Sequence, residues 1–219
     1  MKRTSILLSV IFVIAVVIFT MTVSIALPIY CRPFYYAHVD ALDLPGTWGV
    51  AREDIIEAYD EVLDFLTVDG REFGTGFLPF SEQGKAHFED CKILFDLNKY
   101  ALIASFAVIV LLLLLNLIGV IRLGKPFDLP LSFFAGIGTL VLFATLGVVV
   151  SKDFKAAFTV FHKMFFPGKT NWMFNPYTDP IILFMPQQFF MDCALLICVS
   201  ILLISVFFIV RGIVKKNKA

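Results

Sequence analysis

Three histidines are the residues of this 219-residue chain best suited to chemistry. Imidazole is the side chain that most readily transfers protons near neutral pH. His87 lies three residues before Asp90, so the two side chains can share one face of a helix. His162 lies at the edge of an aromatic stripe, where polar and apolar surroundings meet. His38 lies in a connector and is expected to be peripheral, and each histidine could also serve only as a hydrogen-bonding residue.

Asp192 is the only charged residue in the last long apolar stretch of the chain. If that stretch is helical, Asp192 lies about 28 Å from Arg211 along the helix axis. This distance places the carboxylate near one boundary of a membrane. There it could support an imidazole, or it could simply reach interfacial water.

Several catalytic classes lack the residues that they need. The separated histidines fit no metal-ligand spacing, so we expect no metal, and we expect no other cofactor. No C-x-x-C is present, which argues against a disulfide-generating enzyme, although a structural bridge between Cys31 and Cys91 is possible. No G-x-S-x-G is present, so a serine-hydrolase mechanism has no support.

Long uncharged stretches separate the segments that contain the three histidines. The chain is 59% hydrophobic and 16% charged, whereas soluble domains carry about 25% charged residues. A helix needs roughly 20 apolar residues to cross a bilayer. The pattern predicts an all-α membrane protein with one domain over residues 1–219 and four transmembrane helices, at about residues 5–29, 100–121, 129–151 and 188–210.

Basic residues mark one side of these spans. They precede the first span at Lys2 and Arg3, occupy the turn at Arg122 and Lys125, and follow the fourth span. The positive-inside rule then puts both termini in the cytoplasm. Two outer loops, at about residues 30–98 and 152–187, should form a small extracytoplasmic cap that holds all three histidines. Nothing in the charge pattern suggests nucleic-acid binding.

Three helices are expected in the outer loops. Residues 52–68 place apolar side chains at helical spacing and acidic side chains on the opposite face, which predicts an amphipathic helix. A second helix should begin near Ser81 and continue through His87 into the second span. Phenylalanines at helical spacing over residues 154–165 predict a third. Such an aromatic loop should lie on or in the outer leaflet, although the rings could instead only anchor the protein or pack against the first loop.

Two segments resemble a known family, the bacterial lipoprotein intramolecular transacylases. The more specific segment centres on His162 and consists of Phe158, Phe161, His162, Phe165, Phe166, Pro167, Gly168, Asn171, Trp172, Asn175, Pro176, Asp179 and Pro180. The other leads into the second span and consists of Ser81, His87, Phe88 and Asp90. The order of four spans and two outer loops matches over the whole chain.

The resemblance implies a reaction and its substrate. Enzymes of this family move the sn-2 acyl chain of a diacylglyceryl-cysteine lipoprotein to that cysteine's own α-amine, which gives a lyso-form lipoprotein. The partners would then be diacylglyceryl-modified lipoproteins and membrane lipids, in the plasma membrane of a bacterium. The substrate contains both nucleophile and electrophile, so a catalytic serine or cysteine is not needed.

The resemblance also implies roles for particular residues. His87 and His162 would be the catalytic base and a proton shuttle or oxyanion support, in an order that the sequence leaves open. Trp172, Tyr177 and Asp179 would position the substrate, and Asp192 is a further candidate. Two alternatives remain: a lipid-directed hydrolase that uses the same histidines, and a non-enzymatic four-span scaffold. The oligomeric state is left open.

Overall fold

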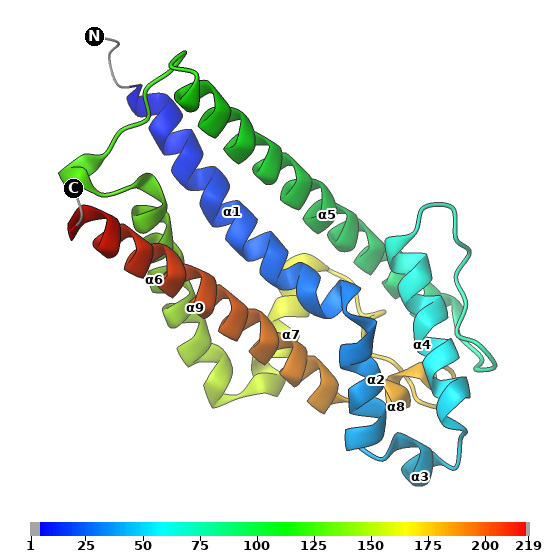
Figure 1. Cartoon of the computed structure of the whole chain (residues 1–219). Coiled ribbons are helices and arrows are strands. Elements are labelled where there is room, and N and C mark those ends of the chain that lie inside the picture. Colours follow the sequence, from blue (N-terminus) through cyan, green and yellow to red (C-terminus); the bar gives the residue numbers. More distant parts are fainter. Residues whose placement is uncertain (1–4, 218–219) are drawn as a thin grey trace. The chain divides into compact units, whose positions relative to one another are not determined.

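Every regular element that the structure describes is a helix (Figure 1). The computed structural model describes residues 5–217, apart from the side chains of residues 144–152. The helices are α1 Ile6–Tyr30, α2 Arg32–Ala41, α3 Leu44–Trp48, α4 Arg52–Thr67, α5 Glu82–Leu117, η1 Pro126–Asp128, α6 Leu131–Lys152, α7 Phe154–Phe165, α8 Ile181–Phe184 and α9 Gln187–Asn217. The predicted helices at 52–68, from Ser81 onward and at 154–165 correspond to α4, α5 and α7, which confirms these three predictions.

Three of the helices are long and apolar enough to cross a membrane. The most apolar windows of α1, α5 and α9 have mean hydropathies of 3.0, 2.6 and 3.1. Helix α6 is 22 residues long, but its apolar part with described side chains extends only over Leu131–Phe143. Three of the four predicted spans are therefore present as long apolar helices, and the fourth stays a prediction.

Two helix ends do not coincide with the ends of the predicted spans, for physical reasons. Helix α5 ends at Leu117 instead of near residue 121, because Gly119 adopts a left-handed conformation with φ of 74°. The amide of Val120 then bonds back to the carbonyl of Leu115, at 2.9 Å. Helix α9 continues past residue 210 to Asn217, since a charged side chain ends an apolar stretch without ending the helix.

The chain forms two compact units. The first, the span unit, comprises the described residues within 1–26, 98–149 and 196–219. Its small core contains Phe12, Val16, Leu112, Leu131 and Ala135. Most other large side chains of α1 and α9 are exposed, as lipid-facing residues would be. Polar groups in α1 are satisfied locally, since Thr20 Oγ1 donates to the carbonyl of Val16 at 2.9 Å.

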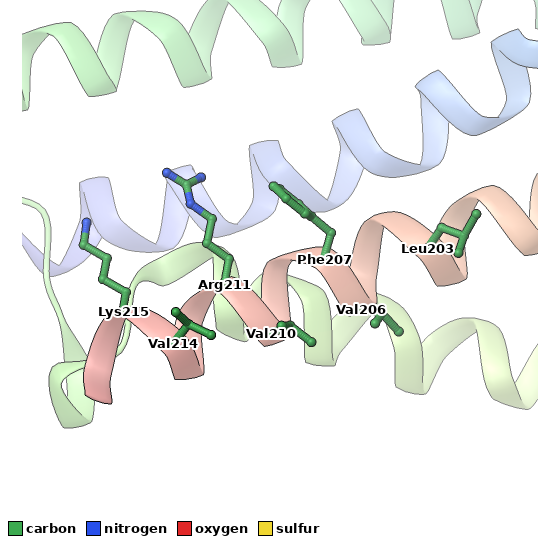
Figure 2. Close-up of a pocket in the computed structure, with 7 residues that line it drawn as sticks. All are labelled: Leu203, Val206, Phe207, Val210, Arg211, Val214 and Lys215. Carbon is green, nitrogen blue, oxygen red and sulfur yellow. The ribbon is translucent and has the colours of Figure 1, made fainter. Parts of the chain in front are cut away.

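A shallow groove of about 710 Å³ lies on the surface of α9 in the span unit (Figure 2). Apolar side chains line it from Leu203 onward, and Arg211 and Lys215 lie at one end. None of the predicted site residues lines this groove. It is therefore not part of the candidate site.

The second unit, the histidine unit, comprises Leu27–Leu97 and Val150–Leu195 and contains all three histidines. Helix α4 supplies much of its core by burying Ile55, Ala58, Tyr59, Val62, Leu63, Phe65 and Leu66. The ring of Tyr35, from α2, stacks on Tyr59 with 3.6 Å between ring centroids. The Tyr35 hydroxyl donates to the carbonyl of Phe184 in α8, at 2.8 Å. These contacts tie α2, α4 and α8 together within this unit.

Candidate functional site

His87 lies on the first part of α5, and the start of this helix is fixed by Asp179. The carboxylate of Asp179 accepts hydrogen bonds from the amide and the hydroxyl of Ser81, at 2.8 and 2.9 Å. The same hydroxyl accepts from the amide of Gly84 at 3.0 Å, as a helix N-cap does. Asp179 is 3% exposed. It therefore acts through the helix that carries His87, two turns of helix away from the imidazole.

Gly84 permits this close approach. A Cβ atom at position 84 would lie 2.2 Å from Oδ1 of Asp179 and 3.1 Å from the ring of Phe174. Neither atom could stay in place beside a methyl group. The absence of a side chain at Gly84 therefore allows both Asp179 and Phe174 to pack against the first turn of α5.

His162 lies on α7, near the end of that helix. Helix α7 begins at Asp153, whose side chain accepts from the amide of Ala156 at 2.9 Å. The Nδ1 atom of His162 is 2.8 Å from the carbonyl oxygen of Phe158, one helical turn earlier. A carbonyl only accepts, so Nδ1 carries the proton, and Nε2 of the neutral ring holds a free lone pair.

The two imidazoles lie next to each other. Their ring centroids are 5.7 Å apart, and the rings are inclined by 35°. Both side chains are buried, with His87 5% and His162 6% exposed. The structure thus brings together the two histidines that the sequence singled out, which are 75 residues apart in the chain (162 − 87).

Aromatic rings surround this pair. Phe166 and Phe174 contact His87 with centroid distances of 5.1 and 5.4 Å. Around His162 the rings are those of Phe158 at 4.1 Å, Trp172 at 4.9 Å, Phe161 at 5.4 Å and Phe166 at 5.7 Å. An apolar shell of this kind disfavours charge on either imidazole.

The electrostatic consequence is that both histidines favour the neutral form. Burial, and after it the neighbouring His162, lower the pKa of His87 from 6.5 to about 4. Burial also lowers the pKa of His162, although its bond to the Phe158 carbonyl acts in the opposite direction. Neutral imidazoles can accept or donate a proton near pH 7, as a transfer reaction requires.

Cys91 lies one helical turn after His87, and its sulfur is 3.3 Å from Nε2 of that histidine. Burial raises the pKa of the Cys91 thiol to about 12, so the thiol keeps its proton. The other nitrogen of His87, Nδ1, is buried and has no hydrogen-bond partner among the described residues. All four cysteines are free thiols, so Cys31 and Cys91 form no bridge in this structure.

The predicted positioning residues lie in different surroundings. Trp172 packs on His162, and its indole N–H donates to the carbonyl of Lys169 at 3.0 Å. Asp179 holds Ser81, the residue that caps the start of α5. Tyr177 is 93% exposed, and its backbone amide donates to the side chain of Asn175 at 3.1 Å. Its exposure gives no support for a role beside the histidines.

Asp192 supports an imidazole, and that imidazole belongs to His38. Its Oδ2 atom is 3.0 Å from Nε2 of His38, and Gln188 donates to both of its oxygens, at 3.1 and 3.0 Å. The Nδ1 atom of His38 is 2.7 Å from the carbonyl oxygen of Phe34. The sequence indicated Asp192 as a candidate support for an imidazole, but it did not identify His38 as the partner.

Two residues at the site were missed as candidates from the sequence. Cys91 is one turn from His87 on α5, a spacing that alone could have suggested the contact. Asp90 was noted for its spacing from His87 and as part of the family-like segment, but no role was assigned to it. Its carboxylate bonds to Lys169 and to Nδ2 of Asn171, with 3.0 Å for the latter, so it ties α5 to the loop that carries Trp172. No local pattern could have predicted this long-range contact.

Comparison with known proteins identifies the family of this chain. Residues 10–190 match the family model described as "Lipoprotein intramolecular transacylase Lit". No curated protein sequence matches the chain. An in meso structure of the membrane integral lipoprotein intramolecular transacylase Lit from Bacillus cereus is similar, with a TM-score of 0.85 and 24% identity over 97% of this chain and 96% of that one.

Two further structures of the Bacillus cereus protein, each with one histidine replaced, are also similar. The variant with arginine has a TM-score of 0.78 and 23% identity over 97% of this chain and 92% of its own. The variant with alanine has the same TM-score and identity over 97% of this chain and 95% of its own. These similarities show the fold, and the family model covers most of the chain. The chain therefore belongs to the lipoprotein intramolecular transacylase family and is a membrane-integral acyltransferase.

Proposed function

We propose that this enzyme moves the sn-2 acyl chain of a diacylglyceryl-cysteine lipoprotein to the α-amine of the same cysteine. The observation that carries the proposal is the pair of neutral imidazoles, with ring centroids 5.7 Å apart, inside an aromatic shell. The substrate supplies both reacting groups. The enzyme must therefore supply a base, a hydrogen-bond donor and a geometry that brings amine and ester together.

His162 is the proposed base. Its Nδ1–H donates to the Phe158 carbonyl, so the lone pair that can accept a proton from the substrate lies on Nε2. As the amine nitrogen attacks the ester carbonyl, Nε2 takes one of its protons. The same proton then passes to the glycerol oxygen when the C–O bond breaks. The α-amine has a pKa of about 7.7–8.0, so the nucleophilic neutral form is present near neutral pH.

His87 is the proposed donor to the developing oxyanion. We assign the Cys91 thiol as the donor to Nε2, because the thiol keeps its proton and imidazole nitrogen is the better acceptor. The ring proton of neutral His87 then lies on Nδ1, the nitrogen without a partner among the described residues. A buried N–H of this kind can stabilise the negative charge that forms on the ester oxygen.

The aromatic shell favours transfer over hydrolysis, which is the second candidate function. A hydrolase with the same histidines would need water at the carbonyl carbon. Rings from Phe158, Phe166 and Trp172 lie against the imidazoles and limit the room for water there. An amine tethered to the same molecule as the ester does not have to diffuse in and is therefore favoured.

The proposal includes a topology in the bacterial plasma membrane. As a helix of 22 residues, α6 is about 33 Å long and would serve as the fourth span. Arg122, Lys125, Arg211 and Lys215 would face the cytoplasm with both termini, whereas the histidine unit would be an extracytoplasmic cap. Lys2 and Arg3, which are also predicted to face the cytoplasm, lie outside the described residues, as does Lys218 after the fourth span.

Accessibility to a membrane-impermeant thiol reagent tests this topology. Single cysteines placed at Gly70 or Lys169 in a cysteine-free background should be labelled from outside intact cells. Cysteines at Gly124 or Lys216 should be labelled only after permeabilisation. Labelling of position 124 from outside would reverse the proposed orientation.

Mass spectrometry of one substrate separates the candidate functions. A diacylglyceryl lipopeptide with a free α-amine should keep its intact mass, because transfer neither adds nor removes atoms. Its fragment spectrum should show one acyl chain retained on the N-terminal residue as an amide that resists mild base. A hydrolase would lower the intact mass by one acyl group, and a scaffold would change neither mass nor fragments.

Acetylation of the α-amine provides the matched control, because it removes the nucleophile and leaves the esters in place. The acetylated lipopeptide should be inert. Loss of an acyl group from that substrate would establish hydrolysis and contradict the proposed transfer.

A further inference from the structure

Asp90 organises the loop that follows α7. One of its carboxylate oxygens pairs with the ammonium of Lys169, and the other accepts from Nδ2 of Asn171 at 3.0 Å. Burial alone would raise the pKa of Asp90, but the bonds to Lys169 and Asn171 lower it overall. The carboxylate is thus ionised and accepts hydrogen bonds from both residues of the loop.

This contact fixes the orientation of the Asn171 side chain. An ionised carboxylate can only accept hydrogen bonds, so the amide nitrogen of Asn171 must face Asp90. The amide oxygen, Oδ1, points elsewhere. It is buried and has no hydrogen-bond partner among the described residues. A buried acceptor without a partner costs free energy, which a ligand with an N–H or O–H group would recover.

Asn171 is the chain neighbour of a residue that packs on the catalytic pair. The next residue, Trp172, packs its ring 4.9 Å from that of His162. Asp90, which holds Asn171, lies one turn after His87 on α5. His87 contributes the second unpartnered buried atom of this unit, the ring nitrogen Nδ1. One unsatisfied buried atom therefore belongs to an imidazole of the catalytic pair, and the other belongs to the residue that precedes Trp172.

We propose that Oδ1 of Asn171 accepts a hydrogen bond from the substrate's α-amine and so orients the nucleophile. This inference rests on the proposed transfer reaction. A neutral primary amine has two N–H groups and one lone pair. During attack the lone pair forms the C–N bond, and one proton goes to Nε2 of His162. The second hydrogen stays on nitrogen, becomes the amide N–H of the product and remains bonded to Asn171.

The second N–H makes the inference testable, because an N-methylated amine lacks it. An N-methyl lipopeptide can still attack and lose one proton, but it has no hydrogen left for Asn171. The experiment compares kcat/KM for the primary-amine and N-methyl lipopeptides with the wild-type enzyme, Asn171→Leu and Asn171→Ala. The ratio of the two values is measured within each preparation, so a partly misfolded variant does not distort it.

The wild-type enzyme should prefer the primary amine, and this preference should fall by about 10-fold in both Asn171 variants. Lys169→Met is the matched control. It removes the other bond to Asp90 but leaves Oδ1 of Asn171, so it should keep the wild-type preference even if it destabilises the loop. The added bulk of the methyl group slows all variants alike and cancels in this comparison.

An unchanged preference in both Asn171 variants would overturn the assignment of Asn171. The proposed function fails differently, since the wild-type enzyme would then form no N-acylated product from the primary amine. Formation of that product together with an unchanged preference would refute the role of Asn171 alone.

Discussion

His38 and His162 share the same local arrangement but lie in opposite environments. Each places Nδ1 against the carbonyl four residues earlier, at 2.7 Å from Phe34 and 2.8 Å from Phe158. The Nε2 atom of His38 faces the carboxylate of Asp192 at 3.0 Å. Around His162 the neighbouring side chains are aromatic, and among the described residues no carboxylate contacts it.

The difference shows how one helical motif can serve two purposes. Both ring nitrogens of His38 face an acceptor, the Phe34 carbonyl on one side and the Asp192 carboxylate on the other. His38 thus joins α2 to α9, and neither of its ring nitrogens is left open for chemistry. His162 has one acceptor only, so it keeps the lone pair that a base needs. Its partner His87 is kept neutral by the same aromatic shell.

The largest expected effect is the loss of catalysis in the buried pair. His162→Gln and His87→Gln should each lower the rate of lyso-lipoprotein formation by about 10²–10⁴-fold, because a base or an oxyanion donor is lost. His38→Gln should retain activity. Rates of N-acyl product formation by mass spectrometry measure this, with thermal unfolding in detergent as the control for folding. Full activity in either member of the buried pair would remove that residue from the mechanism.

The next effect is the dependence of stability on pH. An unfolded histidine binds a proton below about pH 6.5, whereas folded His87 does so only near pH 4. Between these values the unfolded state binds more protons, so the free energy of unfolding should fall as the pH falls, by roughly 1 kcal/mol per unit. Thermal unfolding of the wild-type protein and of His87→Gln measures the contribution. Equal slopes for the two proteins would show that His87 is not responsible.

A smaller effect should follow from disturbing the start of α5. Gly84→Ala would displace Asp179 and Phe174, and we expect it to cost about 1–3 kcal/mol of unfolding free energy and to lower kcat. Gly138→Ala is the control, because a Cβ atom there meets no atom within 4 Å. If both substitutions behave alike in thermal unfolding, Asp179 does not position this helix.

The smallest effect should come from breaking the His38–Asp192 pair. Its side chains are 14% and 28% exposed, and partly exposed pairs with a carboxylate contribute about 1 kcal/mol or less. Asp192→Asn should therefore lower the unfolding free energy slightly and leave the rate of transfer unchanged. A large loss of activity in Asp192→Asn would mean that the two histidine environments are not independent.

Much of the fold follows from patterns along the chain. The apolar stretches predicted α1, α5 and α9, and helical spacing predicted α4 and α7. The predicted second span extended to the charge of Arg122, whereas helix α5 ends earlier, at the left-handed turn of Gly119. Charge shows where a segment becomes polar, whereas backbone conformation shows where a helix ends.

The site was predicted in part for a similar reason. Residue chemistry and the family resemblance singled out His87 and His162, and the packing of Trp172 on His162 is consistent with its predicted role. The partners of the acids were not predictable. Asp192 contacts His38, and Asp90 accepts a hydrogen bond from Asn171, although the residues of each pair are far apart in the chain. Such contacts depend on tertiary packing, which no local pattern encodes.

The central claim is that His87 and His162 are both neutral, with the ring proton on Nδ1, where the enzyme works. Nitrogen-15 NMR of histidine-labelled His38→Gln protein tests it directly, because only these two imidazoles then give signals. Near pH 6.5 each ring should show one protonated nitrogen, Nδ1, and one unprotonated nitrogen, Nε2. A doubly protonated ring at that pH, or a proton on Nε2 of His162, would contradict the account.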